Sequence, residues 1–329
     1  MPSEFDLIRR HFTRPSLHTD LAVGDDAALV RVAADMQLAV TTDTLVAGTH
    51  FFPDTAPRDL GWKTLAVNLS DLAAMGAAPR WATLAITLPG ADEKWLAAFA
   101  DGFFDCANRY GVDIVGGDTT RGPLAMTVTL FGEVPAGAAI TRAGGRPGDD
   151  LWISGQPGLA ALGLAHLQGR ARLADASRAL AALHRPTPRL ELGLALRGLA
   201  HAMLDVSDGL VGDLGHLCEH SALGATLDAT ALPTAALRET GADEAFARRC
   251  LLTGGDDYEL LFAAPPAARD AIAALARRLD LPVFRIGQLT AHAGPVLLRE
   301  ADGGLHVPGT SSYDHFMPAS RNPNGSAMA

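Results

Sequence analysis

Residues 113–122 read DIVGGDTTRG, a short apolar run that ends in two glycines, Asp118, two threonines and Arg121. Glycine pairs after a strand let a backbone approach a phosphate closely, and such phosphate sites usually add a lysine. Here the next charged residue is a carboxylate. The stretch therefore predicts a strand of an α/β fold, followed by a glycine turn that meets phosphate without a lysine.

Strand and helix patterns alternate on both sides of this stretch: strands at 36–45, 80–89 and 124–135, helices at 58–76 and 91–111. The second helix is the clearest, because Asp92 can cap its start and Gly111 can end it. Its apolar residues fall on one face: Trp95, Leu96, Phe99, Phe103 and Tyr110. The first half of the chain is therefore predicted to be a mixed α/β domain.

A second unit is predicted after the glycine-dense turn TRAGGRPGDD, because the strand pattern LWISG follows it at 151–155. We expect an N-terminal domain over 1–146, a C-terminal α/β domain over 147–318 and a disordered tail over 319–329, where apolar residues are few. LLTGGDDYE (251–259) repeats the apolar lead-in, the glycine pair and the Asp of the first domain. This is a weak hint of duplication.

Composition excludes several classes of protein. The chain has 329 residues, 48% hydrophobic and 19% charged, which fits two globular domains. A net charge of −10 disfavours nucleic acid and anionic membranes as partners. The three cysteines form no CxxC pair, the N-terminus lacks a signal peptide, and no apolar run approaches the roughly 20 residues of a membrane span. A cytoplasmic protein is expected.

The lysines exclude the commonest nucleotide site. The chain has two, Lys63 and Lys94, and a P-loop requires glycine directly before its lysine. Trp62 and Glu93 occupy those positions, and no GxGxxG follows a strand. A nucleotide must therefore be bound in another way.

Aspartates beside small residues offer another way to bind a nucleotide, through metal ions. They recur in six clusters: Asp25 and Asp26; Asp43; Asp71; Asp118; Asp205 and Asp208; Asp256 and Asp257. Magnesium prefers oxygen ligands and usually takes one or two carboxylates together with substrate phosphates. Several such clusters brought together would hold ions that bind a polyphosphate.

Each cluster alone also fits a turn or a helix cap, where Asp is common. Asp205 points most strongly to metal, because an uncompensated carboxylate is costly inside an apolar strand. HLCEH (216–220) has a zinc-compatible spacing but no third ligand, so a solvated helix face is favoured. Arg142 and the arginines of RPTPR (185–189) fit either phosphate pairing or ordinary surface charge, and Arg121 is better placed.

Taken together, the motifs resemble the thiamine-monophosphate kinase family, within the superfamily of aminoimidazole ribonucleotide synthetase. The resemblance covers Phe5 to Phe316 and rests on VGDDAAL, TTDTLVAGTHF, KTLAVNLSDLAAMGA, IVGGDTTRGP, LDVSDGLVGDL, TGGDDYELLF and YDHF. It implies two α/β domains and a homodimer whose interface is the N-terminal sheet. It also implies transfer of the γ-phosphoryl group of ATP to thiamine monophosphate, assisted by several Mg²⁺ ions and without a phospho-enzyme. A role for K⁺ stays open.

The resemblance also assigns residues, with no covalent nucleophile among them. The implied metal ligands are Asp26, Thr41, Thr42, Asp43, Asp71, Asp118, Asp205 and Asp208. The implied ATP contacts are Gly117, Asp118, Arg142 and Ser207. The implied thiamine contacts are His50, Asp256 and Tyr313. Family members often carry Glu at the position of Asp256, and Tyr313 equally fits an aromatic that packs the C-terminal segment.

Three other functions compete. Selenophosphate synthetase, from the same superfamily, is expected to carry a reactive Cys and a Lys near its N-terminus, and residues 1–20 contain neither. A metal-dependent phosphatase would use the same aspartates with water as the nucleophile. A non-catalytic scaffold would bind ATP and Mg²⁺ without turnover.

Overall fold

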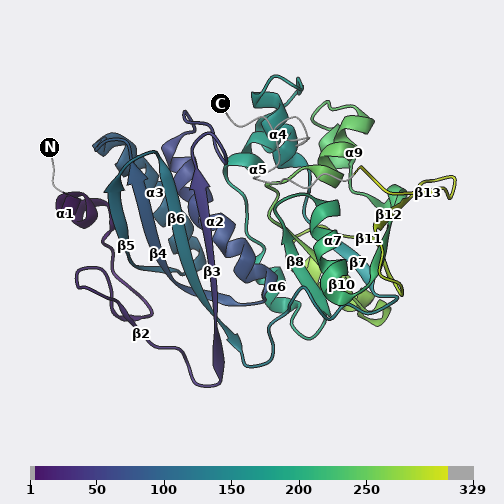
Figure 1. The fold of residues 1–329 in the computed structure, drawn as a ribbon, viewed down its shortest axis with the longest axis horizontal. Coiled ribbons are helices and arrows are strands. Elements are labelled where there is room, and N and C mark those ends of the chain that lie inside the picture. The colour runs from purple at the N-terminus through teal and green to yellow at the C-terminus, as the bar shows by residue number, and fades with distance from the viewer. Residues whose placement is uncertain (1–3, 310–329) are drawn as a thin grey trace. The chain divides into compact units, whose positions relative to one another are not determined.

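The computed structural model describes residues 4–309 of the 329-residue chain. Its described residues form two compact units, unit 1 with 4–72 and 77–137, and unit 2 with 73–76 and 138–309. The division falls between Gly137 and Ala138, ahead of residue 147, where the sequence predicts the second domain to start. Each unit combines helices with a β-sheet, so the predicted mixed α/β class is confirmed (Figure 1).

Unit 1 is built on the sheet β3-β6-β4-β5, in which β4 and β5 are parallel and the other neighbours are antiparallel. A separate antiparallel pair, β1-β2, precedes it. The elements are α1 (Glu4–Leu7), η1 (Ile8–Phe12), β1 (Thr19–Leu21), β2 (Leu29–Val30), β3 (Met36–Val46), α2 (Pro57–Ala74), β4 (Ala78–Leu88), α3 (Glu93–Tyr110), β5 (Asp113–Arg121) and β6 (Ala125–Pro135).

Helices α2 and α3 cover one face of this sheet (Figure 1). The two helices approach closely because each has a glycine at the contact. A Cβ atom at Gly61 of α2 would overlap the carbonyl oxygen of Phe99, and one at Gly102 of α3 would overlap that of Arg58. The crossing therefore depends on two residues without side chains.

Helix α3 follows its sequence prediction. The carboxylate of Asp92 accepts hydrogen bonds from the backbone N–H groups of Lys94 and Trp95, and Gly111 ends the helix with a φ of 65°. The rings of Phe99 and Phe103 stack with their centroids 6.1 Å apart in the core, where both residues are fully buried. The predicted cap, stop and apolar face are all confirmed.

The other face of the sheet is more open. Along β3, exposure alternates, with Leu38 and Val40 42% and 56% exposed and Leu45 buried on the helix-covered side. Alternate strand residues point to opposite faces. Leu38 and Val40 therefore form an exposed apolar stripe on the open face of the sheet.

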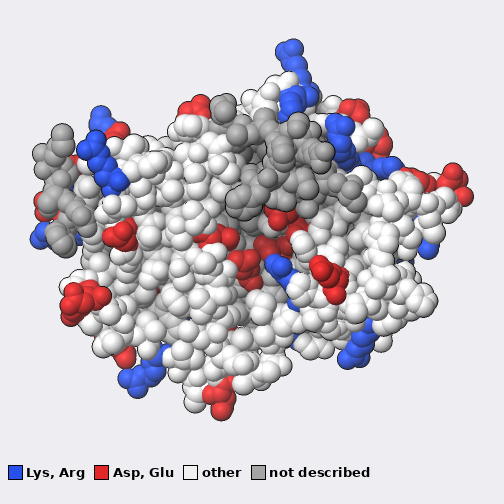
Figure 2. Space-filling model, viewed as in Figure 1, with Lys and Arg blue, Asp and Glu red and all other residues white. Residues whose placement is uncertain are grey.

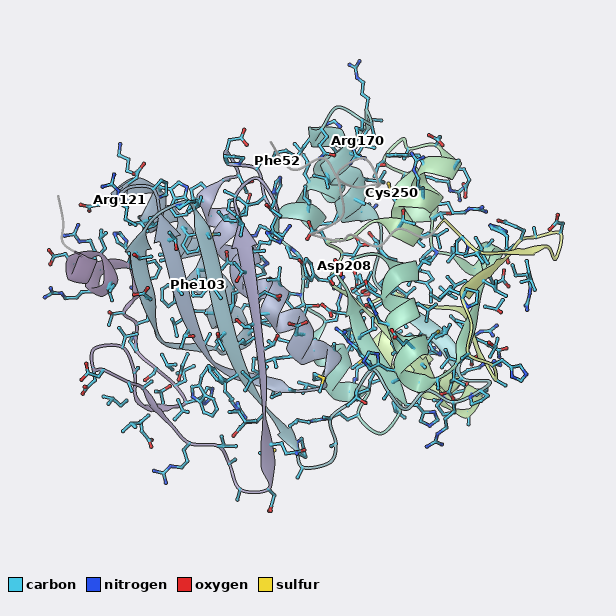
Figure 3. All side chains as sticks on the ribbon, viewed as in Figure 1. Phe52, Phe103, Arg121, Arg170, Asp208 and Cys250 are labelled. Atoms are coloured by element: carbon cyan, nitrogen blue, oxygen red, sulfur yellow. The ribbon has the colours of Figure 1, made fainter. Side chains whose placement is uncertain are left out.

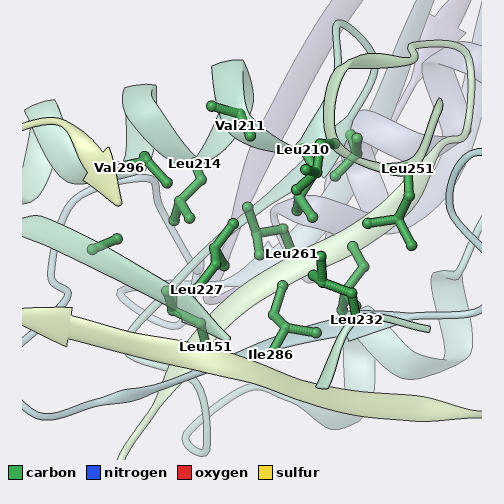
Figure 4. Packing of buried hydrophobic residues seen from close by; sticks show 14 of the residues in the cluster. Leu151, Leu210, Val211, Leu214, Leu227, Leu232, Leu251, Leu261, Ile286 and Val296 are labelled. Atoms are coloured by element: carbon green, nitrogen blue, oxygen red, sulfur yellow. The ribbon is translucent and has the colours of Figure 1, made fainter. Parts of the chain in front are cut away.

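Unit 2 contains the sheet β13-β12-β9-β11-β7-β10-β8, which is antiparallel except between β12 and β9. Leucines dominate the core on one side of this sheet, among them Leu151, Leu214, Leu227 and Leu261 (Figure 4). The elements are β7 (Asp150–Ser154), α4 (Leu159–Leu167), α5 (Ser177–His184), α6 (Leu190–Ala195), β8 (Ala202–Val206), α7 (Leu210–Ser221), β9 (Gly224–Asp228), η2 (Ala229–Ala231), α8 (Ala235–Arg238), α9 (Glu244–Thr253), β10 (Glu259–Ala264), η3 (Pro266–Ala268), α10 (Arg269–Arg278), β11 (Val283–Thr290), β12 (Val296–Arg299) and β13 (Leu305–His306).

The hint of internal duplication is wrong. The apolar lead-in Ile114–Val115 belongs to strand β5, whereas Leu251–Leu252 belongs to the last turn of helix α9. The first glycine pair continues a strand, and the second lies in a loop between a helix and a strand. The two similar sequence motifs therefore form different local structures.

Candidate functional site

A small acidic group joins strand β3 to helix α2 in unit 1. The hydroxyl of Thr41 donates a hydrogen bond to the carboxylate of Asp71. Asp43 follows Thr41 at the next position on the same face of β3, since strand residues two apart share a face. Three of the residues assigned to metal binding thus lie on the helix-covered side of one strand and on the helix against it.

Thr42 does not share this arrangement. Its hydroxyl donates to the carbonyl oxygen of Val128 at 3.0 Å and lies 3.2 Å from the hydroxyl of Thr129. It is exposed on the open face, opposite Thr41. The period of two along a strand separates these consecutive threonines, which the motif TTD in the sequence does not reveal.

Asp118 lies on β5, at the opposite edge of the sheet from β3. The register runs from Asp118 to Ala85, then to Thr127 and then to Thr44. Three strand spacings of ~4.8 Å place the two edges about 14 Å apart. Within one chain, Asp118 is therefore not brought together with Asp43 and Asp71.

The glycine pair that precedes Asp118 is not a turn, contrary to the sequence prediction. Gly116 and Gly117 lie within β5, directly after a shift in its register with β4. Gly117 has a φ of 154°, and a Cβ atom there would overlap the carbonyl oxygen of Leu84. Glycine is required because the two strands approach too closely for a side chain. The exposed Asp118 follows this close contact.

Two further assigned residues of unit 1 lie in loops. Asp26 is exposed between β1 and β2, and its N–H donates to the carboxylate of Asp25 at 2.9 Å. His50 follows β3, and its Nδ1 accepts a hydrogen bond from the N–H of Val46 at 3.0 Å. The latter bond places the proton of the neutral imidazole on Nε2, which can then donate.

In unit 2, three assigned residues lie at the end of strand β8. Asp205 is buried within the strand, where it pairs in register with Leu260. It points away from the leucine core that contains Leu204 and Val206, because alternate strand residues face opposite sides. Ser207 and Asp208 follow in the loop that leads to helix α7 (Figure 3).

One carboxylate oxygen holds this loop. Oδ2 of Asp213, in the first turn of α7, accepts hydrogen bonds from the N–H groups of Ser207, Asp208 and Gly209, each at 3.1 Å. Burial, together with the nearby charge of Asp208, raises the pKa of Asp213 to about 7 although the three bonds oppose the shift. Asp213 is not among the candidates drawn from the sequence, although an acid in the first turn of a helix is a usual signal for such bonding.

The segment GGDDYEL packs beside the same loop. The N–H of Asp256 donates to the carbonyl oxygen of Ser207, and that of Tyr258 to the carbonyl oxygen of Val206, both at 2.8 Å. Asp256 and Tyr258 have φ angles of 67° and 53°, a conformation that residues other than glycine rarely adopt. The hydroxyl of Tyr258 also donates to the Asp256 carboxylate at 3.0 Å. These bonds hold Asp256 against the Ser207 loop.

The other acids of this segment stabilise neighbouring backbone. The carboxylate of Asp257 accepts from the N–H of Gly158 at 2.6 Å, at the start of α4, and burial raises its pKa well above the usual range. Glu259 accepts from the hydroxyl of Ser154 at 2.6 Å and from Nε and Nη2 of Arg189 at 2.7 and 2.6 Å. Arg189 of the RPTPR loop therefore forms a structural ion pair, which the sequence left undecided.

The remaining candidates are spread over the described chain. Arg142 and Arg121 are exposed. His216 and His220 are exposed on α7, which confirms the solvated helix face. Tyr313 lies outside the described residues, as does the YDHF motif. Within residues 4–309, no group of three or more His, Cys, Asp or Glu side chains is arranged to hold a metal ion by itself.

The charges on one face, the cysteines and the helices of the described chain have the following properties. The face in Figure 2 carries acidic and basic side chains of described residues without a continuous basic area. Cys106, Cys218 and Cys250 are buried and unbridged. Among the described helices, none combines the length and the apolar character that a bilayer span requires.

Comparison with known proteins supplies the family. The family model described as "AIR synthase related protein, N-terminal domain" matches residues 24–134, and the corresponding C-terminal domain model matches residues 146–299. A thiamine-monophosphate kinase of Escherichia coli K12 is 48% identical over 320 residues, covering 95% of this chain and 98% of the relative. The chain belongs to the thiamine-monophosphate kinase family.

Solved structures agree with this membership. Thiamine-monophosphate kinase from Stenotrophomonas maltophilia superposes with a TM-score of 0.82 at 48% identity, covering 90% of this chain and 94% of that one. AaThiL, in a structure described as complexed with AMPPCP and TMP, gives a TM-score of 0.73 at 27% identity, covering 95% and 96%. The two-domain aminoimidazole ribonucleotide synthetase fold expected from the motifs is confirmed for this family member.

Proposed function

We propose that this protein transfers the γ-phosphoryl group of ATP to thiamine monophosphate, giving thiamine diphosphate and ADP. The observation that carries the proposal is the 48% identity to a thiamine-monophosphate kinase over nearly the full length of both chains. The structure described with both AMPPCP and TMP supports the same pair of substrates. The selenophosphate synthetase alternative has no comparable support.

We propose that Mg²⁺ is held by the oxygen-rich residues identified above. The donor chemistry fits, because Thr41 and Asp71 already share a hydrogen bond and Asp43 lies on the same face. Magnesium commonly takes only one or two carboxylates and completes its shell with phosphates and water. The full proposed set is Asp26, Thr41, Asp43, Asp71, Asp118, Asp205 and Asp208, whereas the Thr42 hydroxyl points to the other face of the sheet. K⁺ stays a further candidate.

Bound magnesium would neutralise phosphate charge, and this chain's residues would position the substrates. Phosphoryl transfer depends mainly on in-line placement and charge neutralisation, so no covalent nucleophile is needed. We assign Gly117, Asp118, Arg142 and Ser207 to ATP. We assign His50, Asp256 and Tyr313 to the binding of thiamine monophosphate. The Nε2–H group of His50 would donate a hydrogen bond to an oxygen atom of this substrate.

We further propose a homodimer in which each active site uses both chains. The exposed Leu38 and Val40 supply an apolar stripe on the open face of the unit 1 sheet. Asp118 lies at one edge of that sheet and Asp43 at the other, which prevents them from sharing an ion within one chain. A second copy that places its β5 edge beside this chain's β3 edge would bring the two strands that carry these carboxylates side by side. The buried, unbridged cysteines support the proposal that the protein is located in the reducing cytoplasm.

The test is incubation with ATP, Mg²⁺ and thiamine monophosphate, followed by identification of the products. We expect thiamine diphosphate and ADP in equal amounts, and no turnover after chelation of the metal. Release of inorganic phosphate in place of thiamine diphosphate would identify the phosphatase alternative. Binding of ATP without any product would identify the scaffold.

A further inference from the structure

We infer that Asp213 is the positioning residue of the ATP site, whose carboxylate fixes the Ser207–Gly209 loop in the shape that receives Mg²⁺ and ATP. The inference rests on the proposed function, which assigns Ser207 to ATP and Asp208 to metal. In this role Asp213 itself contacts neither ATP nor thiamine monophosphate. It acts through the loop.

The geometry carries the inference. Three consecutive N–H groups converge on a single oxygen atom of Asp213 at 3.1 Å, and the residue is 6% exposed. Bonds to three successive amides fix the backbone angles of the loop, from which its side chains project. The bonds therefore determine the direction of the Ser207 and Asp208 side chains.

The loop is also held from its other side. The carbonyl oxygen of Ser207 accepts the N–H of Asp256 at 2.8 Å. Gly209 has a φ of 121°, and a Cβ atom there would come within 2.9 Å of the backbone carbon of Thr253. The N–H groups of Ser207, Asp208 and Gly209 all donate to Asp213, so removing this acceptor should loosen the loop before it unfolds the domain.

Five variants separate this role from general stability. Asp213→Asn keeps an acceptor oxygen of similar size, and Asp213→Ala removes it. Asp150→Asn is the matched control, since Asp150 is a fully buried carboxylate of the same unit that bonds to Arg269, Arg285 and Gln288 and to no amide of the loop. Asp208→Asn, alone and combined with Asp213→Asn, completes a double-mutant cycle.

The first readout is affinity for Mg-AMPPCP by calorimetry, with no acceptor present. We expect about tenfold weaker binding for Asp213→Asn and a larger loss for Asp213→Ala. In the Asp208→Asn background the effect of Asp213→Asn should shrink. Steady-state kinetics should show a raised KM for ATP with KM for thiamine monophosphate within about twofold, whereas Asp150→Asn lowers Tm and leaves both constants unchanged.

Hydrogen exchange tests the same inference without any bound substrate. The amides of Ser207, Asp208 and Gly209 should exchange slowly in the wild-type protein and quickly in folded Asp213→Ala. Fast exchange in the wild type, or unchanged nucleotide affinity in both Asp213 variants, would overturn the inference. So would an equal rise of both KM values accompanied only by a lower Tm. Nucleotide binding and exchange remain measurable if the thiamine assignment fails, so the two failures are distinguishable.

Discussion

At the scale of single residues, buried carboxylates in this protein mostly organise backbone and arginines. Asp213 bonds to a loop, Asp257 to the start of a helix and Glu259 to Arg189. These bonds offset part of the cost of leaving water, although burial still raises the pKa of Asp213 and of Asp257. A carboxylate in a glycine-rich motif is therefore not by itself a metal ligand.

Asp150 gives a pH-dependent prediction. Burial alone would raise its pKa, but hydrogen bonds from Arg269 and Gln288 and the charges of Arg269 and Arg285 outweigh it, so its pKa lies below 3.8. A lowered folded-state pKa contributes stability that is present above the unfolded pKa and is lost as pH falls through the folded pKa. Asp150→Asn should therefore reduce the free energy of unfolding at pH 7 by about 1–3 kcal/mol.

The check is urea unfolding of wild type and Asp150→Asn at a series of pH values. The difference between them should be constant from neutral pH down to about pH 4, near the usual Asp pKa, and should shrink below it. A difference that grows on acidification would contradict the assigned ion pair. Both arginines are about half exposed, so added salt should weaken the effect.

At the scale of elements, the close approach of helices α2 and α3 decides how unit 1 packs. Gly102→Ala puts a methyl group into the carbonyl oxygen of Arg58, a backbone atom that cannot turn aside. We expect a loss of at least about 2 kcal/mol, since overpacking a rigid contact is strongly unfavourable. Chemical denaturation measures it.

Gly215→Ala is the matched control for that prediction. Gly215 lies in helix α7, and a Cβ atom there meets nothing within 4 Å. Alanine has the higher helix propensity, so this substitution should stabilise the protein by about 0.5–1 kcal/mol. Equal effects of the two substitutions would show that propensity, and not the helix contact, governs Gly102.

At the scale of the whole molecule, the positions of Asp43 and Asp118 predict complementation between subunits. Asp43→Asn and Asp118→Asn should each fold and be inactive. In a mixture of the two, half of the dimers combine both variants and have one intact site in two, so activity should return to about a quarter of wild type. Mixed dimers, isolated with two affinity tags after joint refolding, make the measurement direct.

A mixture of Asp43→Asn with Asp71→Asn is the control. These residues lie on the same side of one chain, joined through Thr41, so every mixed dimer has a defect in both sites. No activity should return. If the Asp43 and Asp118 mixture also stays inactive while dimers exchange, each site belongs to one chain and the shared-site proposal fails.

The sequence by itself determined what short-range chemistry controls. The cap at Asp92, the stop at Gly111 and the apolar face of α3 follow from local rules. Two lysines preceded by Trp62 and Glu93 excluded a P-loop, and the order of the motifs identified the family. These conclusions depend only on residue types and on residues that are close together in the sequence.

Only the tertiary structure decided which residues meet. The period of a strand separated Thr42 from Thr41, and the strand order placed Asp118 across the sheet from Asp43. The Gly116–Gly117 pair became a close strand contact, while Gly254–Gly255 lies beside the Ser207 loop. Such contacts depend on register and packing between elements, which no local pattern encodes.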